Sequence, residues 1–151
     1  MSLLNNWIFL ASFAAITFGL GDFIVVLSGE KNMDIFNLYM AYNIIVGLVS
    51  LVFLYLVKRD SFNKIKNFSG FEWLIVLSFS ILYYSAYMSH FIALQKAPNP
   101  GYSNALIMFH VVILTLLSVV FLNKPLNWLT TLGIGISFVG AYMVILYSGI
   151  D

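Results

Sequence analysis

Five long apolar stretches constrain the fold of this chain more than any other feature of its sequence. They cover residues 7–27, 35–57, 73–94, 103–122 and 128–147. An α-helix rises about 1.5 Å per residue, so each stretch is long enough to cross a hydrocarbon core of about 30 Å. A helix also satisfies its own backbone hydrogen bonds where water is absent. The sequence therefore predicts an all-α, polytopic membrane helix bundle with five transmembrane helices, in contact with the lipid bilayer.

Composition excludes several classes of protein. Hydrophobic residues make up 62% of the 151 residues and charged residues only 9%, so we expect 1–151 to form a single integral membrane domain without a soluble one. A net charge of +1 provides no field for nucleic acid, and the absence of cysteine excludes thiolate metal ligands. We find no catalytic triad, no metal-spaced ligand cluster and no phosphate-binding loop. The sequence thus predicts neither an enzyme nor a protein that needs a cofactor or metal.

The basic residues predict the orientation of the chain. Five of the seven Lys and Arg residues belong to the connections after the second and fourth stretches, and two belong to the connections on the opposite side. Residues 58–66 hold four of the five. By the positive-inside rule this segment faces the cytoplasm, which places the N-terminus inside and the C-terminus outside. The first stretch exceeds the usual length of a signal-peptide core, and no basic residue precedes it, so we expect it to stay as a span. The expected location is a plasma or cell membrane.

Polar and small side chains form stripes along the second and third stretches. Lipid tails give such groups no reason to point outward, so the stripes are expected to face other helices or a cavity. Serine and threonine are expected to form hydrogen bonds between helices, whereas an amide in mid-span and several tyrosines also suit the wall of a solute path. The members of the stripes are Tyr39, Asn43, Gly47 and Ser50 in the second stretch, and Ser80, Tyr84, Tyr87 and His90 in the third.

Three ionisable side chains lie within the apolar stretches. Asp22 is the only acid inside such a run, and an intramembrane carboxylate indicates a functional site unless it reaches the interface. It is suited to bind a cation, carry a proton or pair with a solute amine. His90 and His110 are expected in the outer half of the membrane, either as packing residues or as groups that titrate near neutral pH. The predicted solute-binding residues are Asp22, Tyr39, Asn43, Tyr84, Tyr87 and His110.

The connections and the last stretch carry further signals. Residues 58–72 read as a polar loop, and Ser103 or Asn104 is expected to cap the fourth helix. Gly133, Ser137 and Gly140 follow a small-xxx-small spacing, which permits close approach of helices within the protein or between two copies.

Several runs of sequence resemble the EamA-type half of the drug/metabolite transporter superfamily. They are residues 93–98 (ALQKAP), 105–107 (ALI) and 117–126 (LSVVFLNKPL), followed by Gly133 and Gly140. The chain differs from that family at Val111, where a proline is common, and at Lys124, where a glutamate is common. The resemblance implies one five-span repeat of a ten-span, inverted-repeat architecture that moves small metabolites or amphiphilic solutes.

Transporter sites usually lie between two repeats. We therefore do not expect one five-span repeat to enclose a solute and also to open to both sides of the membrane. The expected function is therefore a transporter of small solutes that acts as a homodimer or with an inverted partner chain. The alternative is a membrane scaffold or accessory subunit without transport. Polar stripes that border a cavity favour transport, and stripes sealed by packing favour a scaffold.

Overall fold

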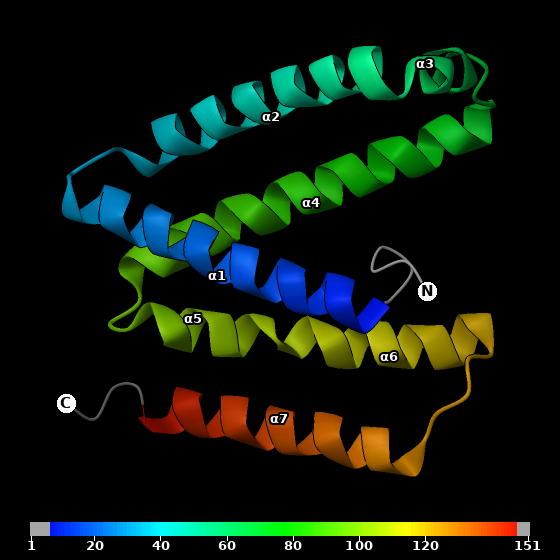
Figure 1. The fold of residues 1–151 in the computed structure, drawn as a ribbon. Helices are drawn as coiled ribbons and strands as arrows, with labels where there is room; N and C mark the ends of the chain where they lie inside the picture. The colour runs from blue at the N-terminus through cyan, green and yellow to red at the C-terminus, as the bar shows by residue number, and fades with distance from the viewer. Residues whose placement is uncertain (1–6, 148–151) are drawn as a thin grey trace. The chain divides into compact units, whose positions relative to one another are not determined.

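The structure, a computed structural model, describes residues 7–147 of the chain, and all its regular elements there are α-helices (Figure 1). The prediction that the N-terminus lies inside and the C-terminus outside falls on residues outside this range. The helices are α1 (Trp7–Glu30), α2 (Ile35–Val57), α3 (Arg59–Lys66), α4 (Gly70–Lys96), α5 (Pro100–Ile107), α6 (Phe109–Leu122) and α7 (Trp128–Tyr147).

The five predicted spans are confirmed as helical segments of sufficient length and hydropathy to cross a membrane. They are Ile8–Glu30, Ile35–Val57, Gly70–Lys96, Pro100–Leu122 and Trp128–Tyr147. Most of their apolar side chains are exposed. Such surfaces suit contact with lipid tails, which are as apolar as the side chains themselves.

The helices gather into two compact units, each described by itself. Met1–Ile92 contains α1, α2, α3 and most of α4, and Ala93–Asp151 contains the end of α4 with α5, α6 and α7. In the first unit, buried side chains collect where the end of α1, the start of α2 and the last turns of α4 meet. Val25, Tyr39 and Phe91 are each less than a tenth exposed there. In the second unit α7 runs antiparallel beside α5 and α6 (Figure 1).

Short-range hydrogen bonds fix the turn between α1 and α2. Asn32 adopts a left-handed backbone conformation (φ 55°), and the Met33 N–H donates to the Ser28 carbonyl at 3.0 Å. This arrangement satisfies carbonyl groups that the helix end leaves without partners. The Asp34 side chain then accepts from the Asn37 N–H at 2.9 Å and caps α2. The turn therefore holds α1 and α2 as adjacent antiparallel helices.

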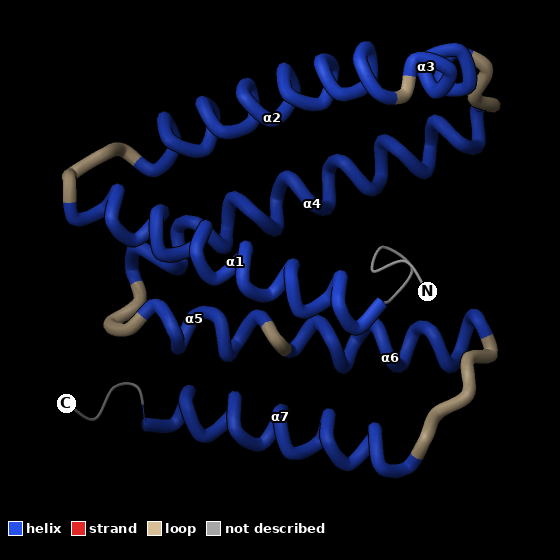
Figure 2. The backbone as a smooth tube through the Cα atoms, viewed as in Figure 1, coloured by secondary structure: helices blue, strands red, loops and turns tan. Residues whose placement is uncertain are grey.

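The predicted polar loop over residues 58–72 is corrected by the structure, because it contains the helix α3. Figure 2 shows α3 end-on while α2 and α4 run across the view, so α3 lies crosswise to both spans. After α3, Ser69 and Glu72 form a reciprocal cap, in which the Glu72 carboxylate accepts from the Ser69 N–H at 2.7 Å. The Ser69 Oγ accepts from the Glu72 N–H at 3.3 Å. This cap starts α4.

The predicted cap of the fourth span at Ser103 or Asn104 is wrong. The Asn99 side chain caps α5 by accepting from the Gly101 N–H at 2.8 Å, and Pro100 occupies the first turn, where its missing N–H costs nothing. The span is also interrupted at Met108, between α5 and α6. The Val111 N–H donates to the Met108 carbonyl rather than to that of Ile107, which breaks the regular i to i−4 pattern.

Candidate functional site

Asp22 of α1 and His90 of α4 form a side-chain pair inside the first unit. The His90 Nε2 lies 3.0 Å from the Asp22 Oδ1, and their side chains are 14% and 17% exposed, respectively. Both residues lie roughly two turns before the end of a span, so the pair lies below the headgroup level if these helices cross the membrane. An ionised Asp22 accepts only, so the His90 Nε2 carries the hydrogen of this bond.

The other ring nitrogen of His90 is buried and has no hydrogen-bond partner among the described residues. With a neutral imidazole this Nδ1 is an acceptor, because Nε2 holds the hydrogen. Proton uptake at Nδ1 changes the pair from a net charge of −1 to zero. The arrangement thus suits a group that exchanges a proton or accepts a hydrogen bond from a solute.

Tyr39 is the centre of an aromatic cluster directly beside the pair. Its ring is 1% exposed and contacts three other rings of α2 and α4. The centroid distances are 6.2 Å to Tyr42, 5.1 Å to Tyr84 and 5.4 Å to Phe91. Phe91 also lies 6.3 Å from the His90 ring, which joins the cluster to the Asp22–His90 pair. Tyr42 and Tyr84 remain 40% and 43% exposed, so their rings are available to a bound molecule.

Hydrogen bonds fix the packing of α2 on α4. The Tyr39 hydroxyl donates to the Tyr84 carbonyl at 2.7 Å, and the Tyr84 hydroxyl lies 3.6 Å from the Met40 sulfur. The Asn43 amide donates to the Tyr39 carbonyl one turn earlier, at 2.7 Å. Tyr39 is sealed by packing, whereas Asn43 is half-buried and satisfies its own helix.

Tyr87 extends the cluster toward α1. Its ring centroid lies 6.0 Å from that of Tyr83, and it interacts electrostatically with Asp22 and Tyr42. Five side chains from three helices are thus linked, Tyr84 through Tyr39, and they combine a carboxylate, an imidazole and exposed aromatic rings. We call this group the Asp22 cluster; it consists of Asp22, Tyr42, Tyr84, Tyr87 and His90.

Two serines of α4, Ser80 of the polar stripe and Ser85 close to it in the chain, bond within their own helix and not between helices as the sequence suggested. Ser80 donates to the Val76 carbonyl at 2.8 Å, and Ser85 donates to the Leu82 carbonyl at 2.9 Å, both within α4. A hydroxyl satisfied by its own helix has little reason to bind a neighbour. Gly47 and Ser50 lie on an exposed part of α2.

His110 belongs to the second unit, where it supports the break between α5 and α6. Its Nδ1 lies 2.7 Å from the Ile107 carbonyl, the group that loses its helical partner at the break. The Nδ1–H donates this bond, so its tautomer is fixed by the backbone. The ring is otherwise exposed.

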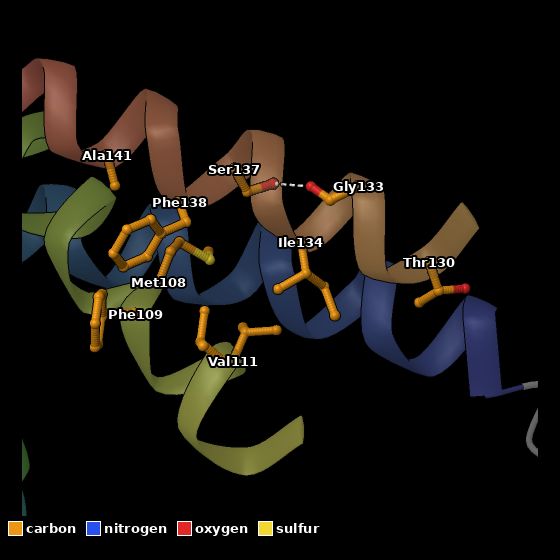
Figure 3. Close-up of a pocket in the computed structure, with 10 residues that line it drawn as sticks. Met108, Phe109, Val111, Thr130, Gly133, Ile134, Ser137, Phe138 and Ala141 are labelled. Carbon is orange, nitrogen blue, oxygen red and sulfur yellow. Dashed lines mark hydrogen bonds between the residues drawn. The ribbon is translucent and has the colours of Figure 1, made fainter. Parts of the chain in front are cut away.

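A groove of about 420 Å³ runs between α7 and the junction of α5 with α6 (Figure 3). Its walls are almost entirely apolar. Figure 3 shows the Ser137 hydroxyl bonded at 3.0 Å to the Gly133 carbonyl, so it offers no free donor to the groove. The Phe109 and Phe138 rings close one end, with centroids 4.8 Å apart. Gly133 and Ser137 line this groove, and a Cβ added at Gly133 or Gly140 meets no atom within 4 Å. Close approach of helices through the Gly133, Ser137 and Gly140 face therefore stays a prediction.

The described residues show no grouping of three or more His, Asp or Glu side chains that suits a metal ion. The Asp22 cluster supplies one carboxylate and one imidazole, which is a poor set of ligands for a divalent cation. A carboxylate, an imidazole and aromatic faces are chemically able to exchange a proton, attract a cation and contact an aromatic group.

Comparison with known proteins supports a functional interpretation. The model of the EamA-like transporter family matches residues 5–146. A search of curated proteins and a search of solved structures gave no significant match.

Proposed function

Because the chain belongs to the EamA-like transporter family, we propose that it carries small metabolites or amphiphilic solutes across a membrane. The family consists of membrane transporters, and the five apolar helices make this chain an integral multi-pass membrane protein. We further propose that both compact units work together as one membrane domain over residues 1–151. The observation that carries the proposal is the Asp22 cluster, in which a carboxylate–imidazole pair lies beside partly exposed tyrosine rings.

The chemistry of the cluster favours an amphiphilic solute with a cationic group. A carboxylate attracts the positive charge, and tyrosine faces attract both a cation and an apolar body. In this proposal Asp22, Tyr84 and Tyr87 contact the solute directly. Tyr39 and Asn43 act as positioning residues, because Tyr39 is sealed and the Asn43 amide bonds to its backbone. His110 is the candidate solute contact of the second unit.

We propose that His90 couples transport to protons. When its Nδ1 is unprotonated, the pair carries one negative charge and attracts a cation; proton uptake removes that charge. Solute and proton then compete for one site, as alternating occupancy requires. Cation binding is therefore expected to weaken when the pair takes up a proton.

The proposal is tested by measuring binding and transport with purified protein. A thermal-shift screen of aromatic amines and neutral aromatic metabolites identifies stabilising ligands, since a ligand stabilises by RT ln(1 + [L]/Kd). Each ligand found is then followed into proteoliposomes that contain the protein. A scaffold or accessory subunit, the alternative function, binds none of them and leaves the liposomes impermeable. A buried side chain such as Tyr39, which is 1% exposed, is expected in a scaffold as well as in a transporter. The partly exposed Tyr42 and Tyr84 rings favour transport.

The proposed orientation places residues 58–66 in the cytoplasm and the turn at Lys31 outside. The chain has no cysteine, so single substitutions label without background. We expect a membrane-impermeant thiol reagent added to intact cells to modify Lys31→Cys and to spare Asn63→Cys until the cells are opened. The positive-inside rule is the reason, because residues 58–66 hold four basic residues. The opposite labelling pattern contradicts this orientation.

We propose that a second five-span unit, in a homodimer or an inverted partner chain, completes the transporter. In alternating access one five-span repeat rocks against another, so two such repeats are required. The exposed side of α7 offers a contact surface, since a Cβ added at Gly140 meets no atom within 4 Å. We expect Gly140→Cys to form disulfide-linked dimers in lipid. Gly140 lies near the middle of α7, so its depth is similar in a parallel and an inverted copy.

The control for this experiment is Tyr142→Cys, which is 53% exposed on the other side of α7. Equal cross-linking of both variants indicates random collision. A protein that transports as a strict monomer, measured by mass in detergent and in lipid, refutes the dimer.

A further inference from the structure

The helix α3 has the character of a helix that lies at a membrane surface. It follows α2 directly and runs crosswise to the spans, as Figure 2 shows. Phe62 and Ile65 are three residues apart and so share one side of α3, while Lys64 and Lys66 occupy its last turn. Lys64 lies two residues after Phe62 and so points to the opposite side, and amphipathic helices with basic residues on the polar face typically lie in the headgroup region.

A groove of about 500 Å³ lies between α3 and the last turns of α2. Its two walls differ in chemistry. The α2 wall is built from apolar and aromatic side chains, while the α3 wall adds an amide and an ammonium group to an aromatic ring. The lining residues are Leu51, Leu54, Tyr55, Phe62, Asn63 and Lys66. The groove therefore has an apolar wall along α2 and a cationic end, at Lys66, near the level where α2 ends.

The cationic end is held in place by Phe62. The Lys66 Nζ lies 4.6 Å from the centre of the Phe62 ring, which orients the ammonium group along the mouth of the groove. Lys58 and Lys64 lie nearby in the chain, and Asp60 is the one acid within residues 58–66. A positive potential at this height suits an anionic headgroup.

We propose that the groove between α2 and α3 binds one anionic phospholipid. An acyl chain lies along Leu51, Leu54 and Tyr55, and the phosphate meets Lys66 and Asn63. Leu51 and Tyr55 are 61% and 69% exposed on a span, so lipid chains reach the α2 wall directly. A soluble phosphate compound has no use for that apolar wall, whereas a phospholipid matches both halves. The lipid fixes α3 against α2 and thereby anchors one end of the first unit. This site is independent of the proposed transport function.

The test uses the purified full-length protein and two defined lipids. Dioleoylphosphatidylglycerol or dioleoylphosphatidylcholine is added in detergent, and native mass spectrometry measures how much of each stays bound. We expect the anionic lipid to bind at least about fivefold more tightly, since one lysine near a headgroup is worth about 1 kcal/mol. Lys66→Gln is expected to reduce that preference by about fivefold.

The matched control is Lys64→Gln, which removes the same charge from the same helix. Among the described residues, Lys64 does not line the groove. We expect Lys64→Gln to keep most of the preference. Equal losses in the two variants indicate an unselective attraction to basic residues and overturn the site. Equal binding of the two lipids by the wild-type protein, or displacement of the anionic lipid by millimolar inorganic phosphate, also overturns it.

Discussion

Replacing Asp22 by Asn is expected to weaken binding of a cationic solute by tenfold or more, about 1.4 kcal/mol, because the carboxylate that attracts the cation is lost. The substitution keeps the size of the side chain and its hydrogen bond to His90. It removes the negative charge of Asp22. With His90 unprotonated the pair is then neutral instead of −1, and with His90 protonated it carries +1 instead of zero. Uptake of a stabilising amine into proteoliposomes is measured between about pH 5 and 8.

Two further variants separate the charge of the cluster from its structure. His90→Gln keeps a polar group beside Asp22 and removes the imidazole, so uptake is expected to become insensitive to pH while solute binding remains. Glu30→Gln removes an exposed carboxylate from the end of the same helix and is expected to change neither property. If His90→Gln retains the wild-type pH profile, proton coupling through this pair is wrong.

The sequence predicts the spans well because hydropathy reports directly on the cost of placing a segment in lipid. All five predicted stretches fall within helices that are long and apolar enough to cross a membrane. Hydropathy did not predict the helix α3, because Arg59–Lys66 is polar and shorter than a hydropathy window. Its signal was amphipathic spacing, with Phe62 and Ile65 three residues apart.

The break at Met108 was equally invisible in the composition. Proline is the usual sign of a kinked span, and this span has none after Pro100. The His110 ring supplies the missing support by bonding the Ile107 carbonyl, which the break leaves without its helical partner. The sequence predicts His110 either as a packing residue or as a functional one. Its bond to the Ile107 carbonyl depends on the break in the helix, which the sequence does not indicate.

Part of the Asp22 cluster was visible in the sequence, because Asp22, Tyr84 and Tyr87 are polar groups within apolar runs. Its pairing was not predicted, since the rotation of each helix about its axis depends on packing. Depth was available as a signal. Asp22 and His90 lie 8 and 6 residues before the ends of their spans at Glu30 and Lys96, so two parallel spans bring them to a similar height. Phe91 and Tyr42 gave no signal, because aromatic residues are common throughout this chain.

Replacing Tyr39 by Ala is expected to cause the largest loss of stability among single changes in the first unit. The side chain is 1% exposed, contacts three rings and donates to the Tyr84 carbonyl at 2.7 Å. Its removal leaves a cavity and a lost hydrogen bond, for which we expect at least about 2 kcal/mol. In lipid this loss comes from packing, because lipid tails and protein interiors are similarly apolar. Thermal unfolding of the purified protein in detergent, followed by circular dichroism, measures the effect.

Tyr39→Phe keeps the ring and removes the hydroxyl, so its expected loss is about 1 kcal/mol, the net value of one hydrogen bond. The control is Phe53→Ala, which removes an aromatic ring of α2 that is 56% exposed, and we expect little change. Since Tyr39 positions the exposed Tyr84 ring, Tyr39→Phe is also expected to weaken solute binding more than Phe53→Ala does. Equal stability of Tyr39→Ala and Phe53→Ala contradicts the packing of α2 on α4, and with it the geometry on which the Asp22 cluster depends.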